Sequence, residues 1–291
     1  MDKFSRETVF HLPGIFEKSR IYERFLILYN EKPEFFRENV KIGSIYGSPL
    51  GAIWNGGRML LGINHLAELQ GCKEFMEESN IPIRFTFTNC LIEEKHLNDT
   101  YCNNILEIFN NGNNEILCNS LILEKYIRTK YGDSYRYISS TTKRIVDKEK
   151  QQEEVNKNCY YLTVLDYDFN TDMDYLKSLT HKDKCEILCN PVCQPCCPRR
   201  EEHYRNISEC QLWYNPYGVF ACVDDKKLFC DAQKSPKFVS IEKIEELTEM
   251  GFKHFKLEGR TSTDADVIDI LVYYLIKDEY QDTARYQLGK P

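Results

Sequence analysis

The residues best suited to chemistry form a cysteine-rich segment in the last third of the chain. Within the stretch CNPVCQPCCPRREEHY, residues 189–204, four cysteines are followed by two arginines, two glutamates and a histidine. Clustered thiols of this kind form disulfides, bind a metal centre, or serve as small buried side chains. Eight of the 13 cysteines lie from Cys185 onwards, so the clustering needs an explanation.

The expected cytoplasmic location and the odd number of cysteines both favour a metal site over disulfides. The N-terminal stretch MDKFSRETVFHLPG lacks the apolar core of a secretory signal, and no apolar run is long enough to cross a bilayer, so we expect a cytoplasmic protein without a membrane partner. Thiols stay reduced in that compartment, and an odd count of 13 excludes complete pairing within the chain. The net charge of −7 argues against non-specific binding to nucleic-acid phosphates.

The spacing of the cysteines suggests which of them bind the metal, but it does not distinguish zinc from an iron–sulfur centre. Pro191 and Pro195 exclude a continuous helix, so we expect a loop that wraps thiolates around a metal. Cys193 forms a CxxC pair with Cys196, which is the commoner zinc spacing, and a CxxxC pair with Cys197. Four thiolates serve zinc and iron–sulfur centres alike, and buried thiols without metal are the simpler alternative.

The elements that must position these residues follow a barrel-like order. Apolar runs typical of strands alternate with helical patterns, and the expected strands span 8–12, 40–46, 82–88, 115–118, 135–139, 160–165, 185–188 and 252–257. Eight strands in 291 residues fit an α/β fold of the TIM-type (βα)8 class, regular or distorted; an open doubly wound sheet is the alternative. We predict one domain over residues 1–291, with residues 189–237 as a Cys-rich metal-binding insertion after the seventh strand.

Active sites in such barrels lie in the loops at the carboxyl ends of the strands. Of the polar residues at the predicted strand ends, Glu258, Arg260 and Lys143 are least explained by helix capping. We expect Glu258 and Arg260 to be catalytic, with Arg260 binding an anion, although a structural ion pair explains them equally well. His203 is the third catalytic candidate, as a general base, a ligand or a cap.

The candidates for substrate binding lie in other predicted loops. They are Asn89, Trp54, Arg58, Lys143 and Asn190. Trp54 and Arg58 belong to the stretch IWNGGR, whose glycines allow the backbone to approach a ligand closely or to make a tight turn. His11, on the first strand, is expected to be a core histidine with a satisfied hydrogen bond, and Cys185 to be a small core residue.

The segment NPVCQPCCPRREEHY resembles the cysteine segment of the U32 peptidase-like proteins. Some members carry C-x-x-x-C-P-x-R-x-x-H, matched in order by Cys193, Cys197, Pro198, Arg200 and His203. The stretch FKHFKLEGRT, residues 252–261, is similar to the family's K-I-E-G-R signature. The resemblance implies a (βα)8-like barrel that binds a [4Fe–4S] cluster through four cysteines, with zinc as the alternative metal.

Two of the four ligands are carried by that motif, namely Cys193 and Cys197. For the other two we choose Cys222 and Cys230, which flank a short Asp-Asp-Lys-Lys turn, with Cys210, Cys189 and Cys90 as rivals. The upstream H-G-x-x-C stretch that supplies ligands in much of the family has no counterpart here. The chain therefore resembles a divergent, short member.

The resemblance implies several activities. Members are named peptidases or collagenase-like proteases, and several instead support oxygen-independent hydroxylation of ubiquinone precursors or RNA bases. A peptidase is least favoured, because no G-x-S-x-G elbow or Ser/His/Asp set is visible. We expect an iron–sulfur-dependent modifying enzyme acting on a small-molecule, peptide or RNA substrate at the barrel mouth. The alternatives are a zinc-stabilised binding or scaffold protein and a U32-type peptidase, and a second chain of the same family is the protein partner we consider.

Overall fold

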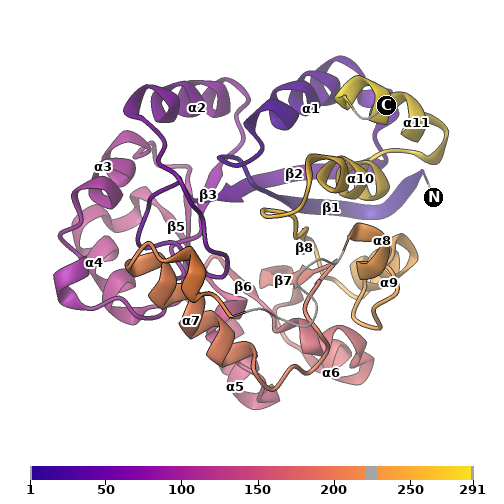
Figure 1. The fold of residues 1–291 in the computed structure, drawn as a ribbon. Coiled ribbons are helices and arrows are strands. Elements are labelled where there is room, and N and C mark those ends of the chain that lie inside the picture. The colour runs from indigo at the N-terminus through magenta and orange to yellow at the C-terminus, as the bar shows by residue number, and fades with distance from the viewer. Residues whose placement is uncertain (1, 221–227, 290–291) are drawn as a thin grey trace.

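The sheet is a closed barrel of eight parallel strands, which confirms the predicted TIM-type fold. In the computed structural model, which describes residues 2–220 and 228–289, the strands pair in sequence order and β8 closes the ring against β1. The strands are β1 (Lys3–Pro13), β2 (Glu38–Gly47), β3 (Ile83–Phe85), β4 (Glu115–Cys118), β5 (Arg136–Ser139), β6 (Leu162–Val164), β7 (Cys185–Leu188) and β8 (His254–Lys256). Figure 1 looks along the barrel, with helices arranged around the strands.

Helices alternate with the strands, as a parallel barrel requires. One α-helix follows each of the first six strands in the described chain, and α7, α8 and α9 lie between β7 and β8. The helices are α1 (Ser19–Glu31), α2 (Leu66–Glu78), α3 (Thr100–Ile108), α4 (Leu121–Tyr131), α5 (Lys148–Val155), α6 (Met173–Ser178), α7 (Arg200–Leu212), α8 (Phe229–Ala232), α9 (Ile241–Glu249), α10 (Asp264–Leu275) and α11 (Gln281–Leu288). No helix in the described ranges has the length and apolar character needed to cross a lipid bilayer.

Polar residues between strand and helix start several of these helices. The side chain of Ser120 accepts a hydrogen bond from the backbone N–H of Leu123 at the start of α4, and Ser240 does the same for Lys243 in α9. Such caps satisfy amide groups that the helix itself leaves unpaired. Capping therefore accounts for part of the polar character of the strand ends.

The inside of the barrel has an apolar half and a charged half. Leu117, Ile138, Leu162 and Val164, from β4 to β6, form a separate buried apolar cluster. On the other side Arg84 of β3 donates to Glu115 of β4 at 2.7 Å and, across the barrel, to Glu186 of β7 at 2.5 Å. All three charged side chains are buried, so each depends on its partners for compensation.

A histidine pair completes the charged half. The Nδ1 atom of His11 lies 2.8 Å from Ser44 Oγ, and its Nε2 atom lies 3.0 Å from His254 Nδ1. Burial lowers the pKa of His11 well below its ordinary value and that of His254 to about 4, so both rings are neutral at pH 7. The prediction of a hydrogen-bonded core histidine at position 11 is confirmed.

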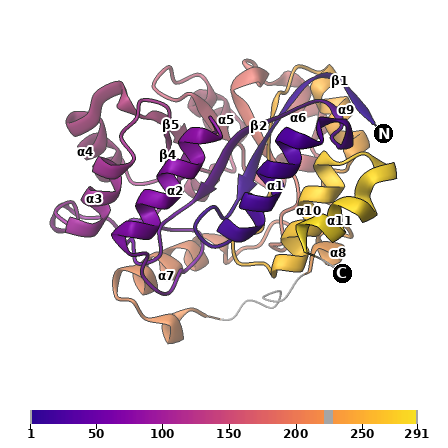
Figure 2. The same cartoon turned by 90° about the horizontal axis from the view of Figure 1, so that it is seen from above.

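Helix α7 crosses the end of the barrel at which the strands finish. Figure 2 shows it on the side of the barrel away from the N-terminal start of β1. The side chain of Asn89 donates to the carbonyl oxygen of Ser208 in α7 at 3.0 Å, and the Leu60 backbone N–H donates to Gln211 Oε1 at 2.9 Å. The long connection after β7 therefore covers the barrel mouth.

Candidate active site

A cavity of about 80 Å³ lies at the barrel mouth. Its floor consists of Tyr46, Leu117, Leu188 and Lys256, from β2, β4, β7 and β8. Its rim comes from the loops that follow the strands and from Tyr204 of α7. This is the position at which (βα)8 enzymes carry their active sites.

Lys256 is a buried amine on the floor of this cavity. Its side chain is 7% exposed, and its Nζ atom lies 3.9 Å from Glu186 Oε1 and 4.2 Å from the centre of the Tyr46 ring. Burial lowers the pKa of Lys256 to about 7, with further lowering by Arg84 and Arg260 that the attraction of Glu186 does not offset. A large fraction of this amine is therefore neutral at physiological pH.

Glu258 and Arg58 form an ion pair at the rim of the cavity. Arg58 Nη2 donates to Glu258 Oε1, and the other carboxylate oxygen accepts from the backbone N–H of Val192 at 3.2 Å. Asn190 holds the backbone of Glu258 by two hydrogen bonds, of 2.9 and 2.7 Å. Both Arg58 and Glu258 line the cavity, whereas Asn190 acts behind them. The loop after β7 is thereby fixed to the loop after β8.

Arg260 also lines the cavity, but protein groups surround its guanidinium. Its Nε atom lies 3.1 Å from Glu17 Oε1, and its terminal nitrogens donate to Thr86 Oγ1 at 2.7 Å and Asn55 Oδ1 at 2.8 Å. Burial raises the pKa of Glu17 despite the charge of Arg260. This arrangement makes Arg260 the centre of a rim network, rather than an arginine open to a substrate anion.

Hydroxyl groups form the remaining polar rim. Ser140 Oγ lies 2.9 Å from Thr142 Oγ1, and Thr141 Oγ1 is a buried atom without a hydrogen-bond partner. In the loop after the neighbouring strand β6 and on α7, the hydroxyls of Tyr167 and Tyr204 are 3.5 Å apart. Thr141 is therefore a cavity-lining residue whose hydroxyl the described protein leaves without a partner.

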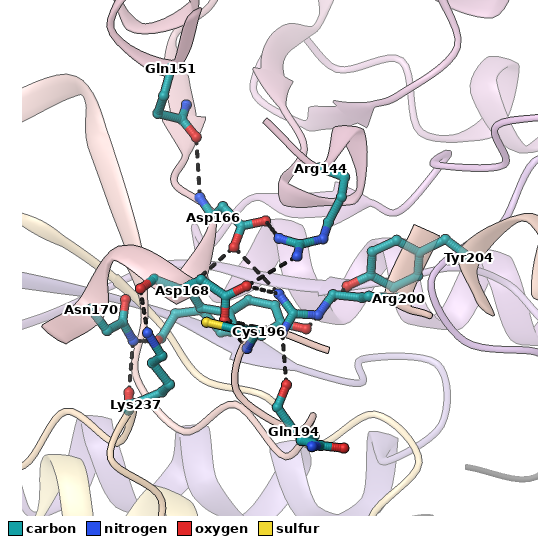
Figure 3. A network of polar contacts seen from close by, with 12 residues as sticks. Arg144, Gln151, Asp166, Asp168, Asn170, Gln194, Cys196, Arg200, Tyr204 and Lys237 are labelled. Atoms are coloured by element: carbon teal, nitrogen blue, oxygen red, sulfur yellow. Dashed lines mark hydrogen bonds and ion pairs between the residues drawn. The ribbon is translucent and has the colours of Figure 1, made fainter. Parts of the chain in front are cut away.

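Arg200 ties the cysteine segment to the loop after β6. Its guanidinium donates to Asp168 at 2.9 and 3.2 Å and to the carbonyl oxygen of Gln194 at 2.8 Å, while the backbone N–H of Cys196 donates to Asp168 Oδ1 at 2.9 Å (Figure 3). Arg144 adds a second cation at 3.1 Å from Asp168. Burial alone would raise the pKa of Asp168, but these hydrogen bonds and charges hold it below its ordinary value.

The cysteines do not assemble a ligand set within the described part of the chain. Among residues 2–220 and 228–289, no three His, Cys, Asp or Glu side chains are grouped so as to hold a metal ion. Cys193 is half-buried, Cys197 is buried, and Cys230 is exposed in α8. Cys222 lies outside the described residues. The metal site therefore stays a prediction, and the described side chains alone do not fit a four-thiolate centre.

Other cysteines are positioned as core residues. The thiol of Cys185 donates to the carbonyl oxygen of His181 at 3.6 Å, and that of Cys189 to the carbonyl oxygen of Ile187 at 3.7 Å. Burial raises the pKa of Cys185 to about 12 and that of Cys189 well above its ordinary value, which disfavours the thiolate form that a metal binds. The described cysteines are not joined by disulfides.

Besides Asn190, four predicted site residues lie away from the cavity lining. Trp54 is fully buried, with its Nε1–H donating to the carbonyl oxygen of His96 at 2.9 Å, and Asn89 is buried between Ile53 and α7. Lys143 donates to Glu154 at 2.8 Å and to the hydroxyl of Tyr160 at 2.9 Å. His203 packs against the Phe220 ring.

Sequence reasoning missed Lys256 and the tyrosines of the cavity. A signal for Lys256 was present, because His254, Lys256 and Glu258 alternate along the last strand and its end. A period of two places alternate residues on one face, so a charged residue in register with His254 points into the barrel. Tyr167 and Tyr204 come from a loop and from a helix that was not predicted, and no pattern connects them.

Comparisons with known proteins support the fold. No family model and no curated protein matches the sequence. A solved structure described as that of the U32 peptidase Mk0906 is similar over 89% of this chain and 95% of that chain, with a TM-score of 0.51 and 11% sequence identity. At this identity the likeness concerns the architecture. The chain therefore has a U32-like barrel fold.

Proposed function

We propose that the chain is a U32-like barrel enzyme that modifies a small polar substrate in the cavity at the barrel mouth. The observation that carries this proposal is the meeting of Lys256, Glu258 and Arg58 in one cavity at the carboxyl ends of the strands. A buried amine with a lowered pKa beside a carboxylate is typical of catalytic sites and is costly in a purely structural role. This favours an enzyme over a binding scaffold.

Within this proposal the groups have distinct roles. Glu258 is the carboxylate of the cavity and exchanges protons with the substrate, while Arg58 and the Val192 N–H hold its two oxygens in place. The hydroxyls of Ser140, Thr141 and Thr142 orient the substrate from the opposite rim.

The finer proposal, an iron–sulfur-dependent modifying activity such as oxygen-independent hydroxylation, rests on the resemblance of the cysteine segment. Cys193 lies close enough to Tyr167 and Tyr204 that its negative charge raises the pKa of both tyrosines. Both tyrosines line the cavity, so a metal centre bound by Cys193 would lie beside the substrate. The described residues do not complete the ligand set of such a centre. Zinc at the same thiolates is the alternative.

Binding measurements test the cavity. Ligand-observed NMR on the full chain with a panel of small polar compounds should reveal ligands whose affinity falls about tenfold in Glu258→Gln, because one charged hydrogen-bond partner contributes on the order of 1.4 kcal/mol. Glu249→Gln, an exposed change on α9, is the matched control and should bind as the wild type does. If no compound binds, or if Glu258→Gln binds every ligand equally well, the cavity is not the active site.

Metal analysis tests the finer proposal. Anaerobic purification followed by iron, sulfide and zinc determination should give a brown protein with iron and sulfide. Cys193→Ala and Cys197→Ala should each lose the metal, whereas Cys185→Ala, a core control, should keep it. Full metal retention in both of the first two variants would show that other residues bind it.

A further inference from the structure

We propose that Lys256 is a nucleophile that forms an imine with a small hydroxylated aldehyde or ketone bound in the barrel-mouth cavity. This inference rests on the proposed function, because it assigns a covalent step and a substrate class to the same cavity. The carrying observation is the position of the Lys256 side chain, which is buried among charged residues yet lines the cavity floor.

The charges inside the barrel do not require Lys256 as a cation. Glu115 and Glu186, the interior carboxylates of the described strands, are compensated by two guanidiniums. Arg84 lies 2.7 Å from Glu115 and 2.5 Å from Glu186, and Arg136 lies 3.5 Å from Glu115. A protonated Lys256 adds a third positive charge to this group. Neutrality of the buried network therefore favours the free amine, which is the nucleophilic form.

The contacts of Lys256 leave the lone pair of its side-chain nitrogen available to attack a carbonyl group. Among the described residues Nζ lies 3.9 Å from Glu186 Oε1 and 4.2 Å from the centre of the Tyr46 ring, and it makes no hydrogen bond. Beneath it Glu186 Oε1 is itself without a hydrogen-bond partner. Burial lowers the pKa of Lys256 to about 7, so about half of the amine is unprotonated near neutral pH.

The chemical step is an addition followed by loss of water. The lone pair of Nζ forms a bond to the carbonyl carbon, and the carbonyl π electrons move to oxygen, which takes up a proton from the nitrogen. A second proton, taken from solvent, allows that oxygen to leave as water while the nitrogen forms a C=N double bond. The products are a protonated imine and one water molecule, and no oxidant or reductant is consumed.

Cavity size and lining limit the substrate. An apolar cavity of about 150 Å³ accommodates benzene, so the cavity of about 80 Å³ suits a compound of about three or four carbon atoms. The cationic groups Arg58 and Arg260 are already paired with Glu258 and Glu17, whereas the hydroxyl of Thr141 is unpartnered. These features favour an uncharged substrate with hydroxyl groups over a carboxylate or phosphate.

Reductive trapping on the full chain tests the proposal. The protein is incubated with dihydroxyacetone and sodium cyanoborohydride, and adducts are located by peptide mass mapping. Each adduct adds the mass of the probe less one oxygen atom. At pH 7 we expect Lys256 to be labelled on the order of a thousandfold faster than an exposed lysine, since their pKa values differ by more than three units and each unit changes the neutral fraction tenfold. Butanone, which lacks hydroxyl groups, should label Lys256 more weakly.

The pH profile gives a second readout. Labelling of Lys256 should rise as the pH increases through about 7 and then level off, because the amine loses its proton there. Burial is the largest cause of this lowered pKa, and the charges of Glu186, Arg84, Arg260 and Glu115 also act on it. Tyr46 lies beside the Lys256 amine, and Arg58 and Glu258 line the same cavity. Exposed lysines should instead gain reactivity only at higher pH.

Variants separate this inference from the proposed function. Lys256→Arg should abolish the site-specific adduct, while Lys253→Arg, an ion-paired lysine outside the barrel, should leave it unchanged. The wild-type peptide map decides the question even if Lys256→Arg folds poorly. If polar compounds bind in the cavity but Lys256 is labelled no faster than exposed lysines, the imine is overturned and the binding site stands. If compounds neither bind nor label, both proposals fail.

Discussion

Replacing Arg200 with alanine should detach the cysteine segment from the barrel. Arg200 is 1% exposed and makes charge-assisted hydrogen bonds to Asp168 at 2.9 and 3.2 Å and to the Gln194 carbonyl oxygen at 2.8 Å. Its guanidinium also lies 4.0 Å from the centre of the Tyr167 ring. Alanine removes all these contacts and leaves Asp168 with fewer cations.

The loss can be estimated from these contacts. Removing one partner of a buried ion pair costs about 3 to 5 kcal/mol. Asp168 is partly exposed and keeps Arg144 at 3.1 Å, so we expect the lower end, about 3 kcal/mol. For a chain of this length about 1 kcal/mol corresponds to about 2 °C in melting temperature, which gives a decrease of about 6 °C.

Urea unfolding followed by circular dichroism measures this difference. Arg199→Ala is the matched control, because Arg199 precedes Arg200 but is exposed and pairs with Glu202; it should cost less than about 0.5 kcal/mol. A thiol reagent supplies a second readout, since buried Cys197 should become reactive in Arg200→Ala. Equal stability of the two variants, with Cys197 still protected, would refute the role given to Arg200.

Three further predictions concern the barrel and its loops. Arg84→Met should cost about 3 to 5 kcal/mol in urea unfolding, because it leaves two buried carboxylates without their shared cation. Burial would raise the pKa of Glu154, but hydrogen bonds lower it from 4.5 to about 2. The free energy of unfolding of the wild type should therefore decrease as the pH falls from about 4.5 to about 2. Glu154→Gln should show a weaker dependence on pH in this range. Gly56→Ala should lower the melting temperature, since a Cβ would lie 2.5 Å from the Thr88 carbonyl group, whereas Gly71→Ala, with open space in α2, should raise it slightly. An unchanged melting temperature in Gly56→Ala would contradict this packing.

The strands were predictable because each contains a short apolar run, and these runs alternate with helical patterns along the chain. β4 and β7 begin and end at the predicted residues, Glu115–Cys118 and Cys185–Leu188. β3 is shorter than predicted, because only Ile83–Phe85 pairs with its neighbours. Periodicity reports burial, and burial continues beyond the last ladder hydrogen bond, so the ends of strands are less well predicted than their existence.

Helix α7 was not predicted, because half of the residues that it buries are polar. Arg200, Ser208 and Gln211 are buried in it through hydrogen bonds to loops that are distant in sequence. An amphipathic pattern detects apolar stripes, so a helix fixed by polar contacts gives a weak signal. The acidic first turn at Glu201 and Glu202 was the available sign of its start.

The candidate site was predictable in position and only partly in composition. Glu258 and Arg58 were expected at the mouth from their places after β8 and β2, and both line the cavity. Trp54, from the same loop as Arg58, turns into the core instead. Sequence places a loop at the mouth, but the direction of each side chain depends on contacts such as that of Trp54 with His96, which lie far along the chain.

Helix α7, which lies across the barrel mouth, also limits which molecules can reach the floor of the cavity. It is fastened at one end through Arg200 to Asp168 and at the other through Gln211 to Leu60. A folded macromolecule is too large to pass beneath α7 and reach the amine of Lys256, whose side chain is 7% exposed. A polymer could place only one of its units in the cavity, and that unit would have to project from the rest of the polymer. The position of α7 therefore favours small free molecules over polymers as substrates.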